Sequence, residues 1–181
     1  MTDRRRWFWC WFLVTLVTDQ AVKTLVRHAL FEHQVLPRPW PGVVEITLSF
    51  NRGVAFGALQ GFGLWLAPVA VVMTGMAIRH AHKNPGETRW VMSGLGLLCS
   101  GALGNVCHRV AFGKVTDMIW VRIVDFPVFN VADSCITAAA IMLGVVWIKP
   151  EPEAANAAHP TEEPASEASA QVAETPAVER S

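Results

Sequence analysis

GKVTDMI at residues 113–119 and VDFPVFNVADS at residues 124–134 lead into a purely apolar run that extends to Leu143. Asp133 lies three residues past Asn130, at the start of a segment apolar enough to cross a bilayer, and Asp117 and Asp125 lie just upstream. An ionisable side chain at membrane depth is costly unless it is paired or hydrated, so it marks a functional site by default. Two carboxylates that share a proton suit hydrolysis. This stretch therefore predicts a membrane helix with a candidate acid–base site at its start.

Four stretches of the chain have the length and apolarity of membrane-spanning helices. Of the 181 residues, 52% are hydrophobic and 17% are charged. The stretches cover residues 7–26, 63–78, 90–110 and 131–148, close to the roughly 20 residues that a hydrocarbon core requires. They are too uniformly apolar to be the amphipathic helices of a soluble domain. We therefore predict an all-α membrane protein, a bundle of four transmembrane helices.

Residues 44–51 interrupt this helical pattern with a strand signal. Four apolar residues alternate with polar ones from Val44 to Asn51, and a period of two is typical of a strand with one buried face. Residues 51–53 then favour a turn, because Asn and Gly tolerate positive φ, and residues 54–58 are expected to return as a second short strand. The prediction is a small extracytoplasmic β element between the first and second spans.

The formal net charge of zero conceals an uneven distribution of charge along the chain. Residues 150–181 contain seven Glu and one Arg, whereas residues 1–149 contain eight acidic and fourteen basic residues. The tail is also rich in Pro and Ala and has no apolar periodicity, so it cannot bury enough surface to fold. We expect one integral membrane domain over residues 1–149 and a disordered, acidic cytoplasmic tail over residues 150–181.

The basic residues before the first span indicate the orientation of the helices. Lys and Arg are equally numerous on the two predicted faces, seven on each, so the overall count does not decide. The Arg4-Arg5-Arg6 cluster favours a cytoplasmic N-terminus. No small-residue cleavage site follows it, so this span is expected to stay as an anchor. With four spans both termini are cytoplasmic, and the unusual polar residues gather near the outer face.

Asp19 and Lys23 stand at positions i and i+4 within the first predicted span, so they lie on one helix face and can pair. Two interpretations are open. The pair is either a structural ion pair whose side chains extend to the interface at the helix end, or a support for a nearby active site.

The chemistry at the fourth span depends on a second carboxylate. Asn130 is a predicted N-cap with Asp133 at the third helical position, where the helix dipole favours a carboxylate. A second carboxylate nearby would leave one acid protonated and the other ionised, and such a pair can activate water and protonate a leaving amine. Asp117 and Asp125 are both candidates for the partner, and composition does not choose between them.

Other reaction types have weaker support in the sequence. Ser134 and Cys135 have only His108 as a candidate base. The zinc-protease pattern His-Glu-x-x-His is absent, and His80 and His82 lack a third ligand nearby. The four Cys are scattered singly through apolar runs, where Cys behaves as a small hydrophobe. We therefore expect neither a metal ion nor another cofactor.

Five groups of residues, in order along residues 7–148, resemble the motifs of the signal peptidase II family, the lipoprotein signal peptidases of bacteria. They are Thr18 to Lys23, Asn51 to Gly57, Gly101 to Asn105 with Arg109, Gly113 to Asp117, and Phe129 to Ser134. The resemblance implies an intramembrane aspartic endopeptidase with Asp117 and Asp133 as catalytic residues and Asp125 as a loop residue. It implies substrate-binding or supporting roles for Asp19, Lys23, Asn51, Gly53, Gly104, Asn105, Arg109 and Asn130.

The resemblance also implies a substrate and a location. The family removes signal peptides from prolipoproteins whose lipobox cysteine already carries diacylglycerol, and it cleaves just before that cysteine. The implied partners are such prolipoproteins and membrane lipids, with no nucleic acid. The protein is expected to act as a monomer in the bacterial cytoplasmic (inner) membrane, with its active site near the outer leaflet.

The chain departs from the family pattern in three places. His108 stands where the family usually has Asp before the Arg of its motif, which removes an expected ion pair with Arg109. Ser100 stands where Gly is common, and the acidic tail is an addition. These departures keep a second hypothesis open, a catalytically silent substrate-binding paralogue or small membrane transport subunit, since buried carboxylates also line proton pathways.

Overall fold

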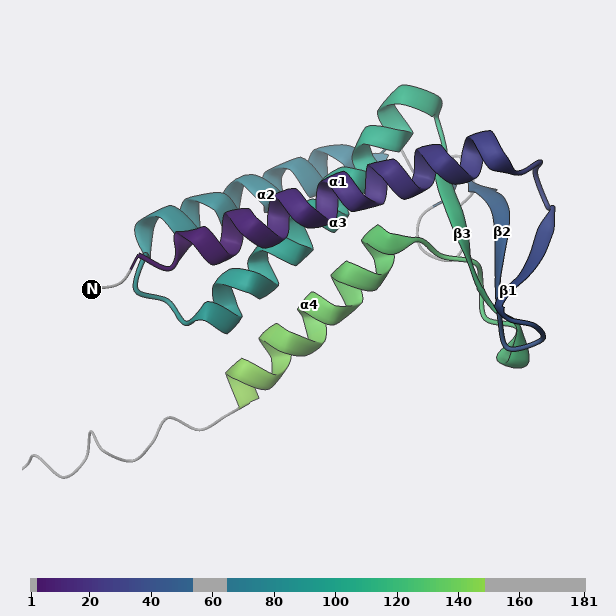
Figure 1. The fold of residues 1–181 in the computed structure, drawn as a ribbon. Coiled ribbons are helices and arrows are strands. Elements are labelled where there is room, and N and C mark those ends of the chain that lie inside the picture. Colours follow the sequence, from purple (N-terminus) through teal and green to yellow (C-terminus); the bar gives the residue numbers. More distant parts are fainter. Residues whose placement is uncertain (1–2, 54–64, 149–181) are drawn as a thin grey trace, which may run out of the picture. The chain divides into compact units, whose positions relative to one another are not determined.

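The computed structural model describes residues 3–53 and 65–148, which lie in one compact unit, Met1–Lys149. Figure 1 shows the long helices with a small sheet at one end of them. The predicted acidic tail, residues 150–181, lies outside the described residues. The elements in chain order are α1 (Arg5–Ala29), β1 (Val35–Trp40), β2 (Val44–Asn51), α2 (Leu66–Lys83), α3 (Arg89–Phe112), β3 (Val115–Val121), the short 3₁₀-helix η3 (Arg122–Val124) and α4 (Val131–Ile148).

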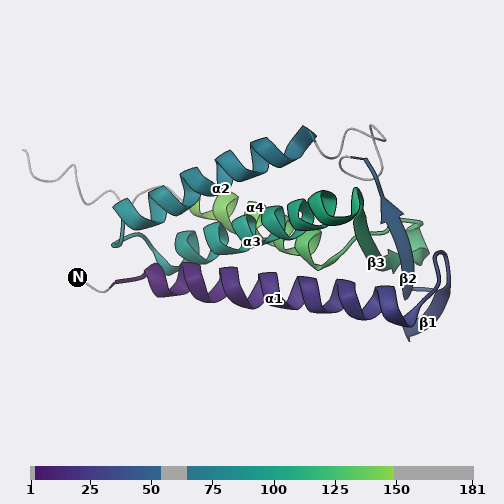
Figure 2. The same cartoon turned by 90° about the horizontal axis from the view of Figure 1, so that it is seen from above.

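The central helix is α3, which contacts each of the other three helices. Figure 2 shows it between α1 and α2. Glycines allow the close approach: a Cβ added at Gly96 would clash with the backbone carbonyl of Phe8 in α1, and one at Gly101 would lie 2.6 Å from the carbonyl oxygen of Ala132 in α4. Small residues let membrane helices pack backbone to backbone in this way.

The ends of the helices differ from the predicted spans for local reasons. Helix α1 is longer than residues 7–26 at both ends, and its last turn carries Arg27, a cation favoured at a helix C-terminus. Helix α2 continues to Lys83, beyond the predicted end of the span at residue 78. The start of the predicted span 63–78 lies outside the described residues. Helix α3 begins after Thr88, whose side chain accepts a hydrogen bond from the Val91 N–H, and it ends at Gly113 with φ 67°.

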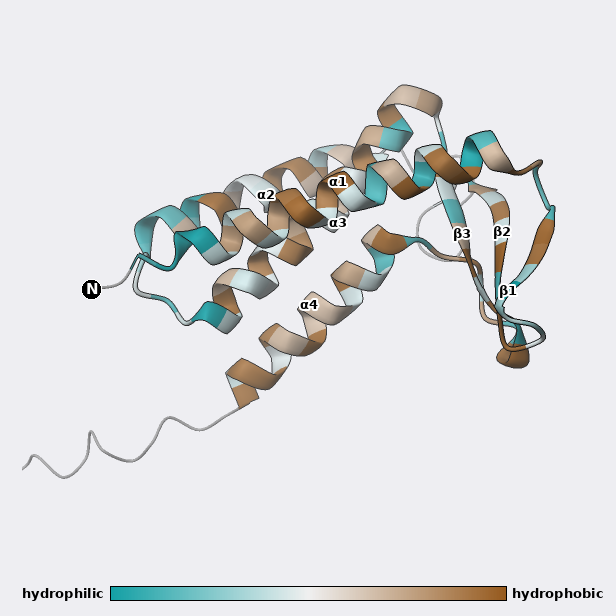
Figure 3. Ribbon diagram, in the orientation of Figure 1, coloured by the Kyte–Doolittle hydropathy of each residue, from teal (hydrophilic) through white to brown (hydrophobic). Residues whose placement is uncertain are grey.

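Two of the described helices, α3 and α4, are long and apolar enough to cross a membrane by length and composition. Hydrophilic and hydrophobic residues are mixed along α1 in Figure 3. The helices nonetheless turn apolar side chains outward: Val17 of α1 is 65% exposed, Val72 of α2 60% and Ile141 of α4 63%. Apolar surface of this kind suits contact with hydrocarbon rather than water. Hydropathy alone therefore supports two of the four predicted spans within the described residues.

The sheet has the strand order β1-β2-β3 and is antiparallel throughout. This corrects the prediction of a β element formed only by the chain between the first and second spans, because β3 comes from the segment between α3 and α4. Pairing of β3 with β2 sets Asp117 opposite Ser49. Partners this distant in sequence cannot be inferred from a local pattern. The predicted return strand over residues 54–58 lies outside the described residues.

The side chains of β2 do not follow a simple alternation of buried and exposed faces. A register shift interrupts the β2–β3 ladder, and Glu45 and Thr47 are buried together with Leu48. Glu45 is satisfied there, because it accepts hydrogen bonds from the Gly42 N–H at 2.9 Å and from Arg122 Nη1 at 2.9 Å. Polar groups can be buried when they are paired in this way.

Candidate active site

Helix α4 begins with a reciprocal pair of hydrogen bonds between Asn130 and Asp133. The side-chain oxygen of Asn130 accepts a bond from the Asp133 N–H at 3.0 Å, and Asp133 Oδ2 accepts one from the Asn130 N–H at 3.2 Å. This capping-box arrangement confirms the predicted N-cap and fixes the Asp133 carboxylate at the start of the helix.

The same asparagine also binds Asp117. Asn130 Nδ2 donates to Asp117 Oδ1 at 2.6 Å, and both side chains are buried. Asp125, by contrast, is exposed at the end of η3. The structure therefore brings Asp117, and not Asp125, together with Asp133 around one asparagine.

Burial raises the pKa of the Asp117 carboxyl to about 6. The negative charge of Asp133 contributes to this raised pKa, whereas hydrogen bonds from Asn130 and Asn51 and the charge of Lys23 oppose the rise. An acid with a raised pKa beside a second carboxylate is a candidate for general acid–base chemistry, and the two groups titrate as a pair.

Asn105 of α3 connects this carboxylate pair to α1. Its Nδ2 donates to Asp133 Oδ1 at 2.8 Å, and its Oδ1 accepts bonds from Lys23 Nζ at 2.8 Å and from Asn130 Nδ2 at 3.2 Å. Lys23 Nζ in turn lies 2.8 Å from Asp19 Oδ2, and neither side chain of this ion pair is exposed. Four elements, α1, α3, β3 and α4, thus contribute to one buried polar network.

The position of Asp19 contradicts one feature of the two interpretations of its pair with Lys23, the extension of the side chains to the interface. Asp19 Oδ1 accepts a hydrogen bond from the Ala132 N–H at 3.0 Å, so this carboxylate binds a free amide in the first turn of α4. The interpretation that the pair extends to the interface is wrong, because both side chains lie inside the bundle. Gln20, a polar residue to which the sequence assigned no role, donates to Asp19 Oδ2 at 2.9 Å and to the Gly104 carbonyl at 3.2 Å.

Gly104→Ala is expected to destabilise this network. A Cβ added at Gly104 would lie 2.5 Å from Asp19 Oδ2, and the carboxylate cannot move away without leaving its partners. We expect a loss of about 1–3 kcal/mol in the free energy of unfolding, measured by denaturation of the protein in detergent. Gly144→Ala is the control, because an added Cβ there meets nothing within 4 Å. Equal losses in the two variants would contradict the close approach.

Arg109, Gly53 and Asn51 lie together at one edge of the network. Arg109 Nη2 donates to the Gly53 carbonyl at 3.1 Å, and the Gly53 N–H donates to Asn51 Oδ1 at 2.8 Å. Asn51 also hydrogen-bonds Asp117. Among the described residues, the buried Nε of Arg109 has no hydrogen-bond partner.

His108 and Ser100, the two residues of α3 that differ from the usual family pattern, have separate hydrogen-bond partners. His108 is buried, and its Nδ1 lies 3.3 Å from Thr116 Oγ1 in β3. The imidazole therefore links α3 to the strand residue that precedes Asp117, in place of the ion pair that an Asp would offer Arg109. Ser100 Oγ donates to the Leu97 carbonyl at 2.9 Å, within α3 itself.

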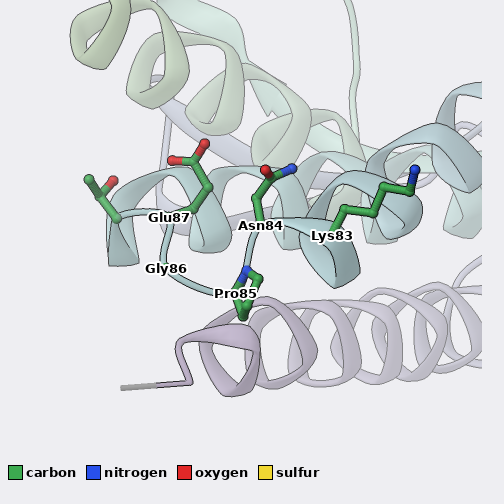
Figure 4. A pocket seen from close by; sticks show the side chains of 6 residues that line it. Lys83, Asn84, Pro85, Gly86 and Glu87 are labelled. Carbon is green, nitrogen blue, oxygen red and sulfur yellow. The ribbon is translucent and has the colours of Figure 1, made fainter. Parts of the chain in front are cut away.

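Residues 3–53 and 65–148 contain no group of three or more His, Cys, Asp or Glu side chains that could hold a metal ion. His80 lies 3.4 Å from Glu87, which with Lys83 lines a surface hollow at the turn between α2 and α3 (Figure 4). This turn is at the opposite end of α3 from Asn105, so the hollow is not part of the carboxylate site.

The fold is similar to that of solved structures described as a bacterial membrane enzyme. A solved structure described as a bacterial membrane enzyme, determined by the in meso method at 2.3 Å resolution, matches 81% of this chain and 93% of its own, with a TM-score of 0.73 and 26% identity. A second structure with the same description, at 1.9 Å resolution, gives a TM-score of 0.71 over 80% and 94% of the two chains, again with 26% identity.

The chain belongs to the signal peptidase II family. Residues 11–149 match the family described as Signal peptidase (SPase) II. Proteins named lipoprotein signal peptidase are 34% identical in Gloeobacter violaceus, over 81% of this chain and 85% of the relative. The identity is 36% to the relative in Streptococcus pneumoniae, over 77% of this chain and 90% of the relative. It is 37% to the relative in Pseudomonas putida, over 81% of this chain and 88% of the relative. The resemblance carried by the motifs is therefore confirmed, and membership of this family makes the chain a peptidase.

Proposed function

We propose that this chain is an intramembrane aspartic endopeptidase that removes signal peptides from diacylglyceryl-modified prolipoproteins and cleaves just before the lipidated cysteine. The observation that carries the proposal is the double contact of Asn130, which hydrogen-bonds both Asp117 and Asp133. Family membership and the name of the relatives support lipoprotein processing. The buried carboxylate pair supports the aspartic type of chemistry.

In the proposed mechanism the two acids share one proton. The ionised carboxylate takes a proton from a water molecule, whose oxygen attacks the carbonyl carbon of the scissile peptide bond. The protonated carboxyl gives its proton to the leaving amine nitrogen as the C–N bond breaks, and the lipidated cysteine becomes the new N-terminus. Burial of Asp117, which raises its pKa, helps the pair to keep this proton.

The other polar residues of the network would hold the acids and the substrate. Asp19 and Lys23, with Asn105, keep Asp133 in place from α1 and α3, and Gly104 leaves room for them. Arg109, with Asn51 and Gly53, would bind the peptide backbone of the substrate beside the carboxylates. No cofactor or metal ion enters this mechanism.

We also propose that all four helices cross the bacterial inner membrane, with both termini in the cytoplasm. The outward apolar side chains of the helices and the hydropathy of α3 and α4 support this placement. The site would then lie near the outer leaflet, where the acyl chains of the substrate remain among lipid tails and the peptide approaches beside the sheet. The protein would act as a monomer whose partners are prolipoproteins and membrane lipids, with no nucleic acid.

A cleavage assay tests the function itself. The purified full-length chain in detergent is mixed with a synthetic lipobox peptide that carries diacylglycerol on its cysteine, in the presence of a chelator, and the products are weighed by mass spectrometry. We expect a product that begins at the lipidated cysteine, and no cleavage of the same peptide without the lipid. Tight binding of the lipidated peptide without cleavage would favour the catalytically silent alternative.

The value of kcat/KM is expected to fall as the pH rises through about 6. The pKa of Asp117 is raised from 3.8 to about 6, so the carboxyl holds its proton below that pH and loses it above, and kcat/KM reports the free enzyme. The raised pKa of Asp117 also affects stability. Between pH 3.8 and about 6 the free energy of unfolding should fall as the pH rises, because the folded state binds more protons than the unfolded state. A pH–rate profile measures the first effect; activity that increases across this range would contradict it.

A further inference from the structure

Arg27 and Lys114 lie together at the end of the helices that carries the sheet. Both cations lie over the ring of Phe50, with Arg27 Cζ 5.6 Å and Lys114 Nζ 3.3 Å from its centroid. Arg27 also stacks on Phe112, the last residue of α3, at 3.8 Å. Phe50 and Phe112 therefore form one aromatic platform under two positive charges.

Neither cation has a carboxylate partner within residues 3–53 and 65–148. The ion pairs there use other cations, namely Arg5, Lys23, His33, His80 and Arg122. Residues 54–64 contain no Asp or Glu that could supply one. Cation–π contacts offset part of the cost of desolvating such groups, but they do not neutralise two like charges over one ring.

Arg27 also has an unsatisfied donor. Its Nη1 is buried and has no hydrogen-bond partner in the described part of the chain, and a buried donor left unpaired is destabilising, more so when it is charged. The side chains of Arg27 and Lys114 are both partly exposed, so an anion from outside the protein can reach them. An anion at this place would neutralise the pair.

The surroundings of the platform indicate which anion this is. Phe112 is 50% exposed, so the platform itself presents apolar surface beside the two cations. Cations next to exposed apolar surface are typical of a membrane interface, where Lys and Arg meet lipid headgroups and their stems lie on apolar groups.

We propose that Arg27 and Lys114 bind the phosphate of an anionic phospholipid, whose acyl chains begin at the exposed ring of Phe112. A guanidinium binds phosphate through its planar fork and an ammonium binds it as a point charge. The bound lipid is not the substrate, so this inference goes beyond peptide cleavage and does not depend on it.

Lipid binding to the purified full-length chain tests the proposal. Native mass spectrometry in detergent counts bound phosphatidylglycerol against phosphatidylethanolamine. Arg27→Gln and Lys114→Gln should each weaken phosphatidylglycerol binding about fivefold, since a cation near a lipid surface contributes about 1 kcal/mol. Arg27→Lys keeps the charge and should retain most of the binding. Arg38→Gln, which removes an exposed cation from β1, is the matched control and should not change it.

Three results would overturn the proposal. The first is unchanged phosphatidylglycerol binding in the Arg27→Gln/Lys114→Gln double variant. The second is displacement of the lipid by inorganic phosphate at an equal concentration, which would make this a site for free phosphate. The third is equal binding of phosphatidylglycerol and phosphatidylethanolamine by the unmodified chain, which would mean that the two cations do not select an anionic lipid.

Discussion

Asp117→Asn and Asp133→Asn are each expected to lower kcat for cleavage of a diacylglyceryl lipobox peptide by at least about a thousandfold, because general acid–base groups contribute factors of this size. Asparagine keeps the size of the side chain but can neither take a proton from water nor carry one to the leaving amine. Both residues contact Asn130, so either change removes one half of the proposed proton-sharing pair. Initial rates of the purified variants in detergent, with folding checked by thermal unfolding, measure the effect.

Asp125→Asn is the matched control for these two variants. Asp125 is exposed, and its backbone adopts a left-handed conformation at φ 47°, which Asn also tolerates. A surface substitution of this kind changes the free energy of unfolding by no more than about 0.5 kcal/mol, so the protein stays folded. Asp125 takes no part in the proposed proton transfer, so the rate should stay within about twofold of that of the unmodified protein. An inactive Asp125→Asn beside an active Asp117→Asn would assign the partner of Asp133 to Asp125 instead.

Lys23→Met is expected to lower the free energy of unfolding by about 3–5 kcal/mol, the cost of leaving a buried charge without its partner. Neither Lys23 nor Asp19 is exposed, their charged atoms are 2.8 Å apart, and Lys23 also donates to Asn105. Without the ammonium, the Asp19 carboxylate would stay buried with only neutral donors. Denaturation of the variant in detergent, compared with the unmodified chain, gives the difference.

Two further variants separate the ion pair from a general effect of the substitution. Lys83→Met removes an exposed cation at the end of α2 and should have little effect. Asp19→Asn combined with Lys23→Met removes both charges and should recover part of the lost stability. A loss in Lys23→Met no larger than that in Lys83→Met would contradict the buried pair.

Local patterns were sufficient for the features that depend on neighbouring residues. The spacing of Asn130 and Asp133 predicts the cap of α4, because a capping box joins residues three apart. The spacing of Asp19 and Lys23 predicts their pairing for the same reason. The depth of that pair was not predictable, because burial depends on how α1 packs against α3 and α4.

The features that local patterns missed all depend on contacts between distant segments. Residues 115–121 pair with β2, and Ile119 of this strand also pairs with Phe129, which sets Asp117 near Asn130. Strand β1 contains Pro37 and Pro39, which disfavour strands but are tolerated at the edge of a sheet. Motif resemblance, and not composition, selected Asp117 over Asp125.

The shared proton is tested most directly by titrating the Asp117 carboxyl with NMR on ¹³C-labelled aspartate, in the unmodified chain and in Asp133→Asn. In the unmodified chain the pKa of Asp117 should be about 6. In the variant it should be lower, because the negative charge of Asp133 raises the pKa of Asp117. An Asp117 pKa that is the same in both proteins would mean that the two acids do not share a proton, and would contradict the proposed mechanism.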